Sequence, residues 1–508
     1  MRLFWWTIMA MATAATATGF ETVEAAPSGA SLFWTSNDPA VREARDLALK
    51  GKLSEADTVL TTSSVSATAE DTQARAEGRE ILRRIRIEYD QEPAELLKKL
   101  QQKLPDLTTA DLEYWRQIGQ AQARVLDDKL WYFGREPSNI WLFCDDAKTR
   151  LAQREGRDPR ARPAMSAKEE GLIKHIEEVI AAAESTGKDQ VVPYKITVRY
   201  KLTVKPDRPG AKAGSVVRCW LPFPQQYRQQ KEVRLLRTSP VEHTLAPTAV
   251  DTWPIGGAPQ RTVYFERKIE DPAQPLIFEV DFEFVSCTFY PNLDESKARH
   301  QGHSFPAEYL VDRPTHIVFT PQIRAKVAEI VGPLNNPLAR ARAIFRWICT
   351  NHRWCAEQEY SVLPNASEKL FLAGRGDCGT HALLFITMCR LADVPARWQS
   401  GWETAPGGYN MHDWAEFYVA PWGWLPADTS YGFKDSDNPK VREFYCGHQD
   451  AFRLIVNLDY GCPLQPAKKD FRSEPLDFQR GEVEIDGRNL YFDEWSYKFE
   501  FDQTPIGQ

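Results

Sequence analysis

The hydrophobic pattern of the chain changes its period at about Val191, and this change constrains the fold more than any other feature. Before it, from about Asp38 to Ser185, apolar residues recur three or four apart, most clearly in "PAELLKKLQQKL" and "LIKHIEEVIAAAE". That spacing is typical of amphipathic helices. After it, segments such as "YKITVRYKLTV" and "LIFEVDFEFVSCTFY" alternate apolar and polar residues, which is the period of a strand. The sequence therefore predicts a helical region over residues 27–190 and a β-sandwich-like domain over residues 191–295.

The second half of the chain mixes both patterns. Helical spacing returns from about Pro321 to Asn351, and a compact mixed region follows to about Gly432. The tail reads "GEVEIDGRNLYFDEWSYKFEF", which predicts strands joined by a turn at Asp486 and Gly487. We expect a core over residues 315–435, a C-terminal β extension over residues 436–508, and an α+β fold for the whole chain.

Composition excludes several classes of protein. The chain has 508 residues, of which 43% are hydrophobic and 26% are charged, so it has ample material for several globular domains. Its net charge of -7 gives no global positive field that could hold nucleic acid. We therefore expect no nucleic-acid partner.

The first residues have the pattern of an export signal. "MRLFWWTIMAMATAATATGFETVEAAPSGA" has a basic start, an apolar run, and small residues suited to a signal peptidase. This predicts a signal peptide over residues 1–26 and a secreted or periplasmic protein. No later stretch approaches the roughly 18 apolar residues of a membrane span, so no integral span is expected.

The nine cysteines contain no C-x-x-C pair of the kind found in zinc ribbons or redox loops. In an exported chain some could form disulfides, and Cys349 with Cys355 or Cys446 with Cys462 are near neighbours in the sequence. Connectivity does not follow from sequence. The odd count leaves at least one free thiol.

Cys378 is the first candidate for chemistry. It lies in "GRGDCGTHALLFITMCRLADVPARWQSGW", where apolar residues at helical spacing predict a buried helix that begins just after it. The free N–H groups and the positive dipole end of a helix start favour a thiolate, the form that attacks carbonyl carbon. The flanking Gly376 and Gly379 would let a substrate backbone come close.

A proton partner for this thiol lies further along, in "YNMHDWAEFYVAPWGWLPADTSYG". The alternation around His412 predicts a strand, and a second short strand after the turn ends at Asp428. With Cys378 these residues would form a nucleophile, a general base and a carboxylate that orients the base. Pairing Val419 with Trp424 in a tight hairpin would put His412 opposite Tyr431, so a bulge or a diagonal contact is needed to reach Asp428.

The same segments resemble a known family. "FRWICTNHRW", "GRGDCGTHALLF", "DVPARWQSGW", "MHDWAEFYV" and "GWLPADTSYG" occur in the order found in the core of the transglutaminase-like superfamily, whose fold is similar to that of papain. The resemblance covers about residues 340 to 432. It places the nucleophile on Cys378, the base on His412 and the third member on Asp428. It also implies an oxyanion site at the Cys378 backbone N–H, with Trp354 as a candidate second donor.

The resemblance implies a reaction class. In this superfamily the thiolate attacks a glutamine side-chain amide or a peptide amide, forms a thioester, and passes the acyl group to an amine or to water. The calcium-binding and barrel regions of animal cross-linking enzymes are not recognisable in the sequence, so hydrolysis is favoured and no cofactor or metal is expected. The substrate would be a protein or peptide.

Other residues offer alternatives to this assignment. His381 follows Cys378 by three positions and is a rival base, although a hydrogen-bonded helix histidine is the preferred interpretation. Asp413 alternates away from His412 and is expected either to contact a residue of the site without contacting substrate or to lie at the surface. "HQGH" at His300 to His303 could suggest a metal pair, but loop hydrogen bonding is the preferred interpretation because no third ligand stands at a recognised spacing.

The sequence thus predicts an exported cysteine-dependent acyl-transfer enzyme. The alternative is a cell-surface or periplasmic binding protein that retains the same scaffold without catalysis, and a carbohydrate or cell-wall scaffold is a third possibility. The oligomeric state does not follow from the sequence.

Overall fold

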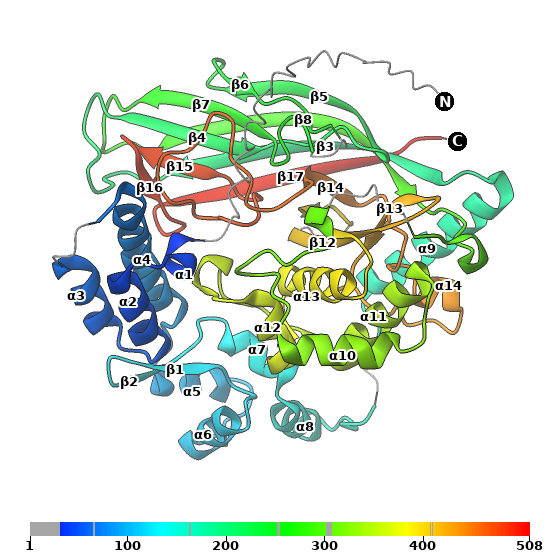
Figure 1. The fold of residues 1–508 in the computed structure, drawn as a ribbon, viewed down its shortest axis with the longest axis horizontal. Helices are drawn as coiled ribbons and strands as arrows, with labels where there is room; N and C mark the ends of the chain where they lie inside the picture. Colours follow the sequence, from blue (N-terminus) through cyan, green and yellow to red (C-terminus); the bar gives the residue numbers. More distant parts are fainter. Residues whose placement is uncertain are drawn as a thin grey trace, which may run out of the picture.

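The computed structural model describes residues 31–63, 67–161, 164–250, 255–300, 307–406, 408 and 410–507. The signal peptide predicted for residues 1–26 lies outside these residues. The predicted α+β fold is confirmed: a helical region, two large sheets and a mixed core follow one another along the chain (Figure 1). No helix in the described residues is long and apolar enough to cross a bilayer.

The first part of the chain is helical, as predicted. Its helices are α1 (Leu32–Thr35), α2 (Pro39–Leu49), α3 (Leu53–Thr62), α4 (Ala69–Glu88), α5 (Pro93–Gln101), α6 (Thr109–Gln117), α7 (Glu136–Phe143), α8 (Asp145–Arg154) and α9 (Ala167–Thr186), with a hairpin of β1 (Ala123–Leu126) and β2 (Lys129–Tyr132) between α6 and α7. Thr68 and Thr108 start α4 and α6 with capping boxes, in which each threonine accepts from the third helical N–H. These caps fix where two of the helices begin.

The helical region also contacts the chain just ahead of Cys378. The indole N–H of Trp34 donates to the carbonyl of Ser361 at 3.0 Å. The side-chain amide of Asn139 makes two hydrogen bonds with the backbone of Ala356. Helices far away in sequence therefore hold the segment that leads to the candidate nucleophile.

Two antiparallel sheets form a sandwich after α9. One has the strand order β16-β15-β4-β7-β6 and the other has the order β17-β3-β8-β5. The strands are β3 (Gln190–Val204), β4 (Val216–Pro222), β5 (Gln230–Ser239), β6 (Thr244–Leu245), β7 (Thr262–Lys268), β8 (Leu276–Phe289), β15 (Glu482–Ile485), β16 (Arg488–Leu490) and β17 (Trp495–Pro505). Tyr200, Trp220 and Phe282 lie in the one core that the two sheets share. The period-2 segments of the sequence supply its central strands.

The C-terminal strands complete this sandwich. β15 pairs with β4 in one sheet, and β17 pairs with β3 in the other from Trp495 opposite Val204 to Pro505 opposite Tyr194. The predicted turn at Asp486 and Gly487 joins β15 to β16, and both of its residues have the positive φ that such a turn needs.

In the sequence, the mixed core lies between strands β8 and β15 of the sandwich. Its helices are α10 (Pro321–Val331), α11 (Pro337–Asn351), α12 (Ala366–Ala373), α13 (Cys378–Leu391) and α14 (Pro439–Arg442), and its sheet has the order β13-β12-β11-β14, with β11 (Ala396–Glu403), β12 (Asn410–Val419), β13 (Gly423–Ala427) and β14 (Arg453–Asn457). A parallel pair, β9 (Arg353–Trp354) and β10 (Arg375–Gly376), precedes α13, and the short 3-10 helices are η1 (Glu295–Lys297), η2 (Ala307–Tyr309) and η3 (Tyr360–Val362).

The core sheet is covered on both faces. Phe417 of β12 meets Phe385 of α13 on one face, with ring centroids 5.8 Å apart. On the opposite face, Glu416 of β12 accepts from the hydroxyl of Tyr227 at 3.0 Å. Trp402 of β11 stacks on Phe499 of the sandwich at 5.2 Å. The sandwich region therefore contacts the core sheet on both faces, because Trp402 pairs with Met411 on the face of Phe417.

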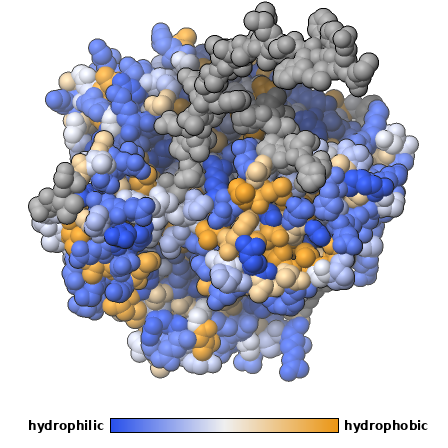
Figure 2. Space-filling view, in the orientation of Figure 1, coloured by the Kyte–Doolittle hydropathy of each residue, from blue (hydrophilic) through white to orange (hydrophobic). Residues whose placement is uncertain are grey.

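The core leaves some apolar side chains in contact with solvent. Figure 2 shows apolar surface to the right of the middle of the face drawn in Figure 1. Among the exposed apolar side chains of this part of the chain are Leu372 of α12, which is 64% exposed, and Val311, which is 46% exposed.

Candidate functional site

Cys378 is the first residue of α13, as the sequence predicts. Asp377 caps the helix by accepting from the N–H of Thr380 at 3.1 Å, and the Thr380 hydroxyl donates back to the Asp377 carbonyl at 3.0 Å. The glycines beside it serve packing rather than substrate approach. A Cβ at Gly376 would lie 2.2 Å from the Thr380 hydroxyl, and one at Gly379 would lie 2.0 Å from the Tyr360 hydroxyl. The space expected for substrate backbone at these glycines is filled by protein.

His412 and Asp428 are brought together. Nε2 of His412 lies 2.6 Å from Oδ2 of Asp428, and both side chains are buried. The hairpin register differs by one residue from the expected one, because Val419 pairs with Gly423 and β13 ends at Ala427. Asp428 therefore lies just beyond the paired strand, where it reaches His412 diagonally. The N–H of Tyr431 donates to its other carboxylate oxygen at 3.0 Å.

Arg453 is a site residue that the sequence analysis missed. Its Nη1 lies 3.0 Å from Oδ2 of Asp428, and its guanidinium lies 4.1 Å from the ring centroid of Tyr431. Burial alone would raise the pKa of Asp428, but the charges of His412 and Arg453 outweigh it and lower this pKa well below its usual range. The sequence feature that could have indicated Arg453 is its position as the one charged residue in the apolar run "AFRLIVN". A buried charge requires a partner.

Asp413 contacts the candidate nucleophile, so of its two expected positions the surface one is wrong. It is 2% exposed, which excludes a surface position, and its Oδ2 accepts from the Sγ of Cys378 at 3.5 Å. The Tyr360 hydroxyl lies 3.0 Å from the same oxygen, and Nε2 of Gln479 donates to the other at 2.6 Å. In the described part of the chain, the thiol is hydrogen-bonded to Asp413 and not to His412.

The surroundings of Cys378 favour the thiol and not the thiolate. Burial is the largest influence and raises the pKa of Cys378 well above its usual value, and the carboxylates of Asp413 and Asp377 add to this. The helix start was expected to favour the thiolate, but the carboxylates of Asp377 at the N-cap and of Asp413 on β12 oppose the effect of the helix dipole. Burial likewise raises the pKa of Asp413, with Asp377 as the next cause.

The remaining candidates fall outside this group. Trp354 is 44% exposed. In the β9–β10 pair it lies opposite Gly376, which is two residues before Cys378 in the sequence. His381 is buried with its ring edge-on to His352 at 6.3 Å, and burial lowers its pKa to about 4. Nε2 of His300 lies 2.9 Å from the carbonyl oxygen of Asn335, whereas His303 lies outside the described residues.

All nine cysteines are free thiols in the structure. Neither of the neighbouring pairs named from the sequence, Cys349 with Cys355 and Cys446 with Cys462, is joined.

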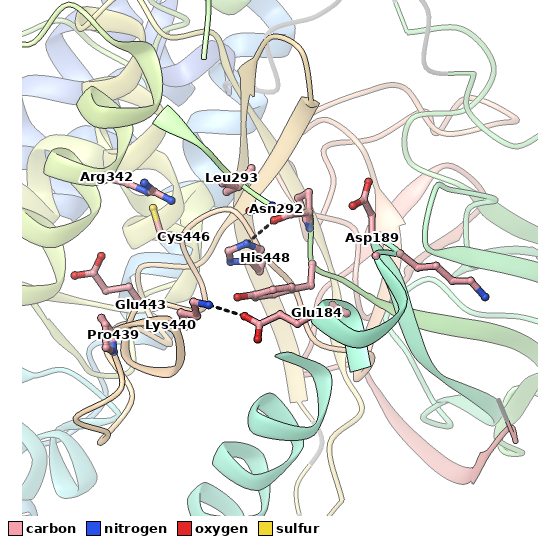
Figure 3. Close-up of a pocket in the computed structure, with 15 residues that line it drawn as sticks. Glu184, Asp189, Asn292, Leu293, Arg342, Pro439, Lys440, Glu443, Cys446 and His448 are labelled. Atoms are coloured by element: carbon pink, nitrogen blue, oxygen red, sulfur yellow. Dashed lines mark hydrogen bonds and ion pairs between the residues drawn. The ribbon is translucent and has the colours of Figure 1, made fainter. Parts of the chain in front are cut away.

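A cavity of about 580 Å³ is lined by the end of α9, the segment after β8 and the segment around α14 (Figure 3). Cys446 lines it and bridges to Ala427, the residue before Asp428. His448 stacks on Tyr290 at 4.2 Å between ring centroids, and Lys440 pairs with Glu184 at 2.5 Å across the cavity. Its lining contains none of Cys378, His412 and Asp428.

Comparisons with known proteins find one similar sequence and several similar solved structures. An uncharacterized protein of Haemophilus influenzae is 25% identical over 239 residues, which are 38% of this chain and 63% of that protein. Among solved structures, a candidate cysteine protease from Cytophaga hutchinsonii is similar with a TM-score of 0.41 and 12% identity, over 63% of this chain and 93% of that one. The periplasmic domain of TgpA from Pseudomonas aeruginosa is similar with a TM-score of 0.24 and 16% identity, over 49% of this chain and 91% of that one.

The family assignment comes from the sequence of the core. The family model described as transglutaminase-like superfamily matches residues 324–429. This range includes α13, the β11–β13 hairpins, and the three residues Cys378, His412 and Asp428. Residues 324–429 of this chain are a core of the transglutaminase-like superfamily.

Proposed function

We propose that the protein is a cysteine-dependent acyl-transfer enzyme in which Cys378 is the nucleophile, His412 the general base and Asp428 the residue that orients the base. The observation that carries this proposal is the 2.6 Å contact of His412 with Asp428, on the strand whose next residue, Asp413, touches the sulfur of Cys378. With Nε2 held by Asp428, Nδ1 is the nitrogen left to take the thiol proton. β13 ends opposite Ala415, so it does not cover the edge of β12 at His412.

The chemistry would follow in balanced steps. The thiol proton passes to Nδ1 of His412, and the electron pair left on sulfur attacks the carbonyl carbon of a peptide or glutamine amide. The negative charge that develops on oxygen would be met by the backbone N–H of Cys378, with Trp354 as a second candidate donor. The imidazolium then gives its proton to the departing nitrogen, and a thioester remains. Water, activated by the same imidazole, would release the acid and restore the thiol.

We further infer that the protein acts outside the cytoplasm. The support is the apolar run with small residues after it at the start of the sequence. Hydrolysis is proposed over cross-linking because the sequence has no recognisable calcium-binding or barrel regions of the animal enzymes. The catalytic unit is proposed to span residues 315–435.

The test is the rate of iodoacetamide labelling at Cys378 between about pH 5 and 9, followed by peptide mapping. Cys287 is partly exposed and lies on β8, away from the site, so it is an internal reference for a thiol without a general base, and burial raises its pKa. We expect Cys378 to label near pH 6 at least tenfold faster than Cys287, and His412→Ala to remove this difference. Equal labelling of Cys378 in the native protein and in His412→Ala would overturn the proposal.

One observation favours the alternative of a binding protein without catalysis. The thiol of Cys378 is hydrogen-bonded to a carboxylate that opposes its ionisation. Labelling of the unfolded chain checks that iodoacetamide reacts with Cys378. If Cys378 in the folded protein then labels no faster than Cys287 at any pH, a binding protein without catalysis explains the structure better than an enzyme does.

A further inference from the structure

Two carboxyl groups and one phenol hydroxyl form a hydrogen-bonded cluster next to Cys378, and both carboxyls cannot be ionised and also accept a proton from that hydroxyl. The hydroxyl of Tyr360 lies 2.9 Å from Oδ2 of Asp377 and 3.0 Å from Oδ2 of Asp413. One hydroxyl has one proton and can donate to only one of these oxygens. Whichever carboxyl does not receive this proton faces the lone pairs of the hydroxyl oxygen, which favours a proton on that carboxyl.

Asp377 is the better placed of the two to remain ionised. It caps the N-terminus of α13, where it accepts from the N–H of Thr380 and meets the positive end of the helix dipole. Asp413 lies on the middle of a strand and is 2% exposed. Its surroundings include Glu474 and Asp477, and the guanidinium of Arg480 is engaged by Glu474 and Glu359. The proton therefore belongs on Asp413.

The same oxygen of Asp413 faces the nucleophile. Oδ2 lies 3.5 Å from Sγ of Cys378, and the backbone N–H of Asp413 is also directed at this sulfur. A thiolate and a carboxylate this close, in a buried setting, would repel each other strongly. Sulfur and oxygen can thus hold one negative charge between them but not two.

We propose that Cys378 and Asp413 share a single proton, so that the sulfur becomes a nucleophile only while the Asp413 carboxyl is protonated. When Asp413 is ionised, the S–H bond stays intact and donates to Oδ2. When Asp413 is protonated, the thiol proton passes to His412, the electron pair of the S–H bond stays on sulfur, and the O–H of Asp413 donates to it. This inference rests on the proposed function, since it assigns the thiol proton to His412.

The pH dependence of labelling tests the proposal. In the native protein, iodoacetamide labelling of Cys378 should rise from about pH 5, pass a maximum, and fall as Asp413 loses its proton. Asp413→Asn keeps a donor next to sulfur and cannot acquire a charge, so the fall should disappear and labelling at about pH 8 should be tenfold faster than in the native protein, which corresponds to one pKa unit. Asp477→Asn is the matched control, because it removes a carboxyl of the same cluster that does not touch the sulfur, and its profile should keep the fall.

A second variant keeps the proposal testable if Asp413→Asn does not fold, which circular dichroism would reveal. Tyr360→Phe removes the hydroxyl that can stabilise the Asp413 carboxylate, so Asp413 should keep its proton to higher pH and the fall should move upward by about one pH unit. Labelling of Asp413→Asn within twofold of the native protein at every pH, or an unmoved fall in Tyr360→Phe, would overturn the proposal.

The outcome for His412→Ala separates this inference from the proposed function. If His412→Ala slows labelling but Asp413→Asn changes nothing, the catalytic function stands and the shared proton is wrong. If Asp413→Asn accelerates labelling and His412→Ala changes nothing, the shared proton stands and the catalytic role of His412 is wrong.

Discussion

The side chain of Asn139, on α7, makes two hydrogen bonds with the backbone of Ala356: its Nδ2 donates to the carbonyl at 2.9 Å, and its Oδ1 accepts from the N–H at 3.0 Å. Asn139 is fully buried. Ala356 lies four residues before Tyr360, whose hydroxyl contacts Asp377 and Asp413 beside the candidate nucleophile. The helical region therefore fixes the backbone of a segment that lines the site.

Replacing Asn139 by alanine should destabilise the protein by about 2 kcal/mol, because it leaves the partly buried N–H and carbonyl of Ala356 without partners. Urea unfolding at neutral pH measures this. Ser138→Ala on the same helix is the control, since Ser138 is exposed, and it should change the free energy of unfolding by less than about 0.5 kcal/mol. Equal effects of the two variants would show that the Asn139 bonds contribute nothing specific.

Arg453→Met should be among the most destabilising single changes at the site. The guanidinium is 2% exposed and neutralises both Asp428, at 3.0 Å, and Asp450, at 3.3 Å. Removing one partner of a buried ion pair typically costs about 3 to 5 kcal/mol. Arg346→Met is the control, because the Arg346 side chain is 55% exposed in its pair with Glu443, and such pairs contribute less than about 1 kcal/mol. A loss below about 1 kcal/mol for Arg453→Met in urea unfolding would contradict the ion-pair account of this residue.

Glu136 should make the protein less stable as the pH rises. Its carboxyl is fully buried, its nearest charged partner is Arg375 at 3.8 Å, and burial raises its pKa to about 7. The unfolded chain has a lower pKa for this group, about 4.3, so the folded state binds more protons between these two values. The stability that this proton provides is complete below about pH 4 and is lost as the pH rises through about 7.

We therefore expect native protein to lose about 2 to 3 kcal/mol of stability from this group between about pH 4.5 and 7.5. Glu136→Gln cannot ionise, so its stability should change less over the same interval, as measured by urea unfolding at a series of pH values. Parallel pH profiles for the two proteins would show that Glu136 is already ionised in the folded state.

Two glycines should respond to alanine in opposite directions. A Cβ at Gly401, on β11, would lie 1.9 Å from the backbone oxygen of Leu454, so Gly401→Ala must push β11 and β14 apart. We expect a loss of about 3 kcal/mol or more. Gly171 is inside α9 with nothing within 4 Å of the added carbon, and Gly171→Ala should stabilise the protein by about 0.5 to 1 kcal/mol. Thermal unfolding of both variants checks the pair, and a stable Gly401→Ala would refute the close strand contact.

Much of the local structure around Cys378 could be predicted from sequence, because it depends on short-range signals. The helical spacing after Cys378 and the alternation around His412 each reflect a single element, and both elements form as predicted. The motif order also identified the family of the core. The catalytic roles of Cys378, His412 and Asp428 remain a prediction that the labelling experiment tests.

The sequence could not show what packs against each face. Alternation places Asp413 and His412 on opposite sides of β12, but it does not tell which side is covered, and here both are: α13 covers one and the sandwich covers the other. The sequence therefore left open whether Asp413 contacts a residue of the site or lies at the surface, and in the structure it contacts the sulfur of Cys378. Arg453 and Gln479 reach the site from 25 or more residues beyond Asp428, and no local pattern connects them to it.

Because β17 pairs with β3, one sheet of the sandwich cannot be completed until a late part of the chain has been synthesised. β3 leaves the ribosome some three hundred residues before Trp495, and its edge has no partner until Trp495–Pro505 has been made. The core that contains Cys378 is synthesised between the two. During synthesis, the sheet of the sandwich that contains β3 lacks one edge strand, and it is complete only when β17 is added. The sheet behind the site is therefore complete only after Trp495–Pro505 has been made.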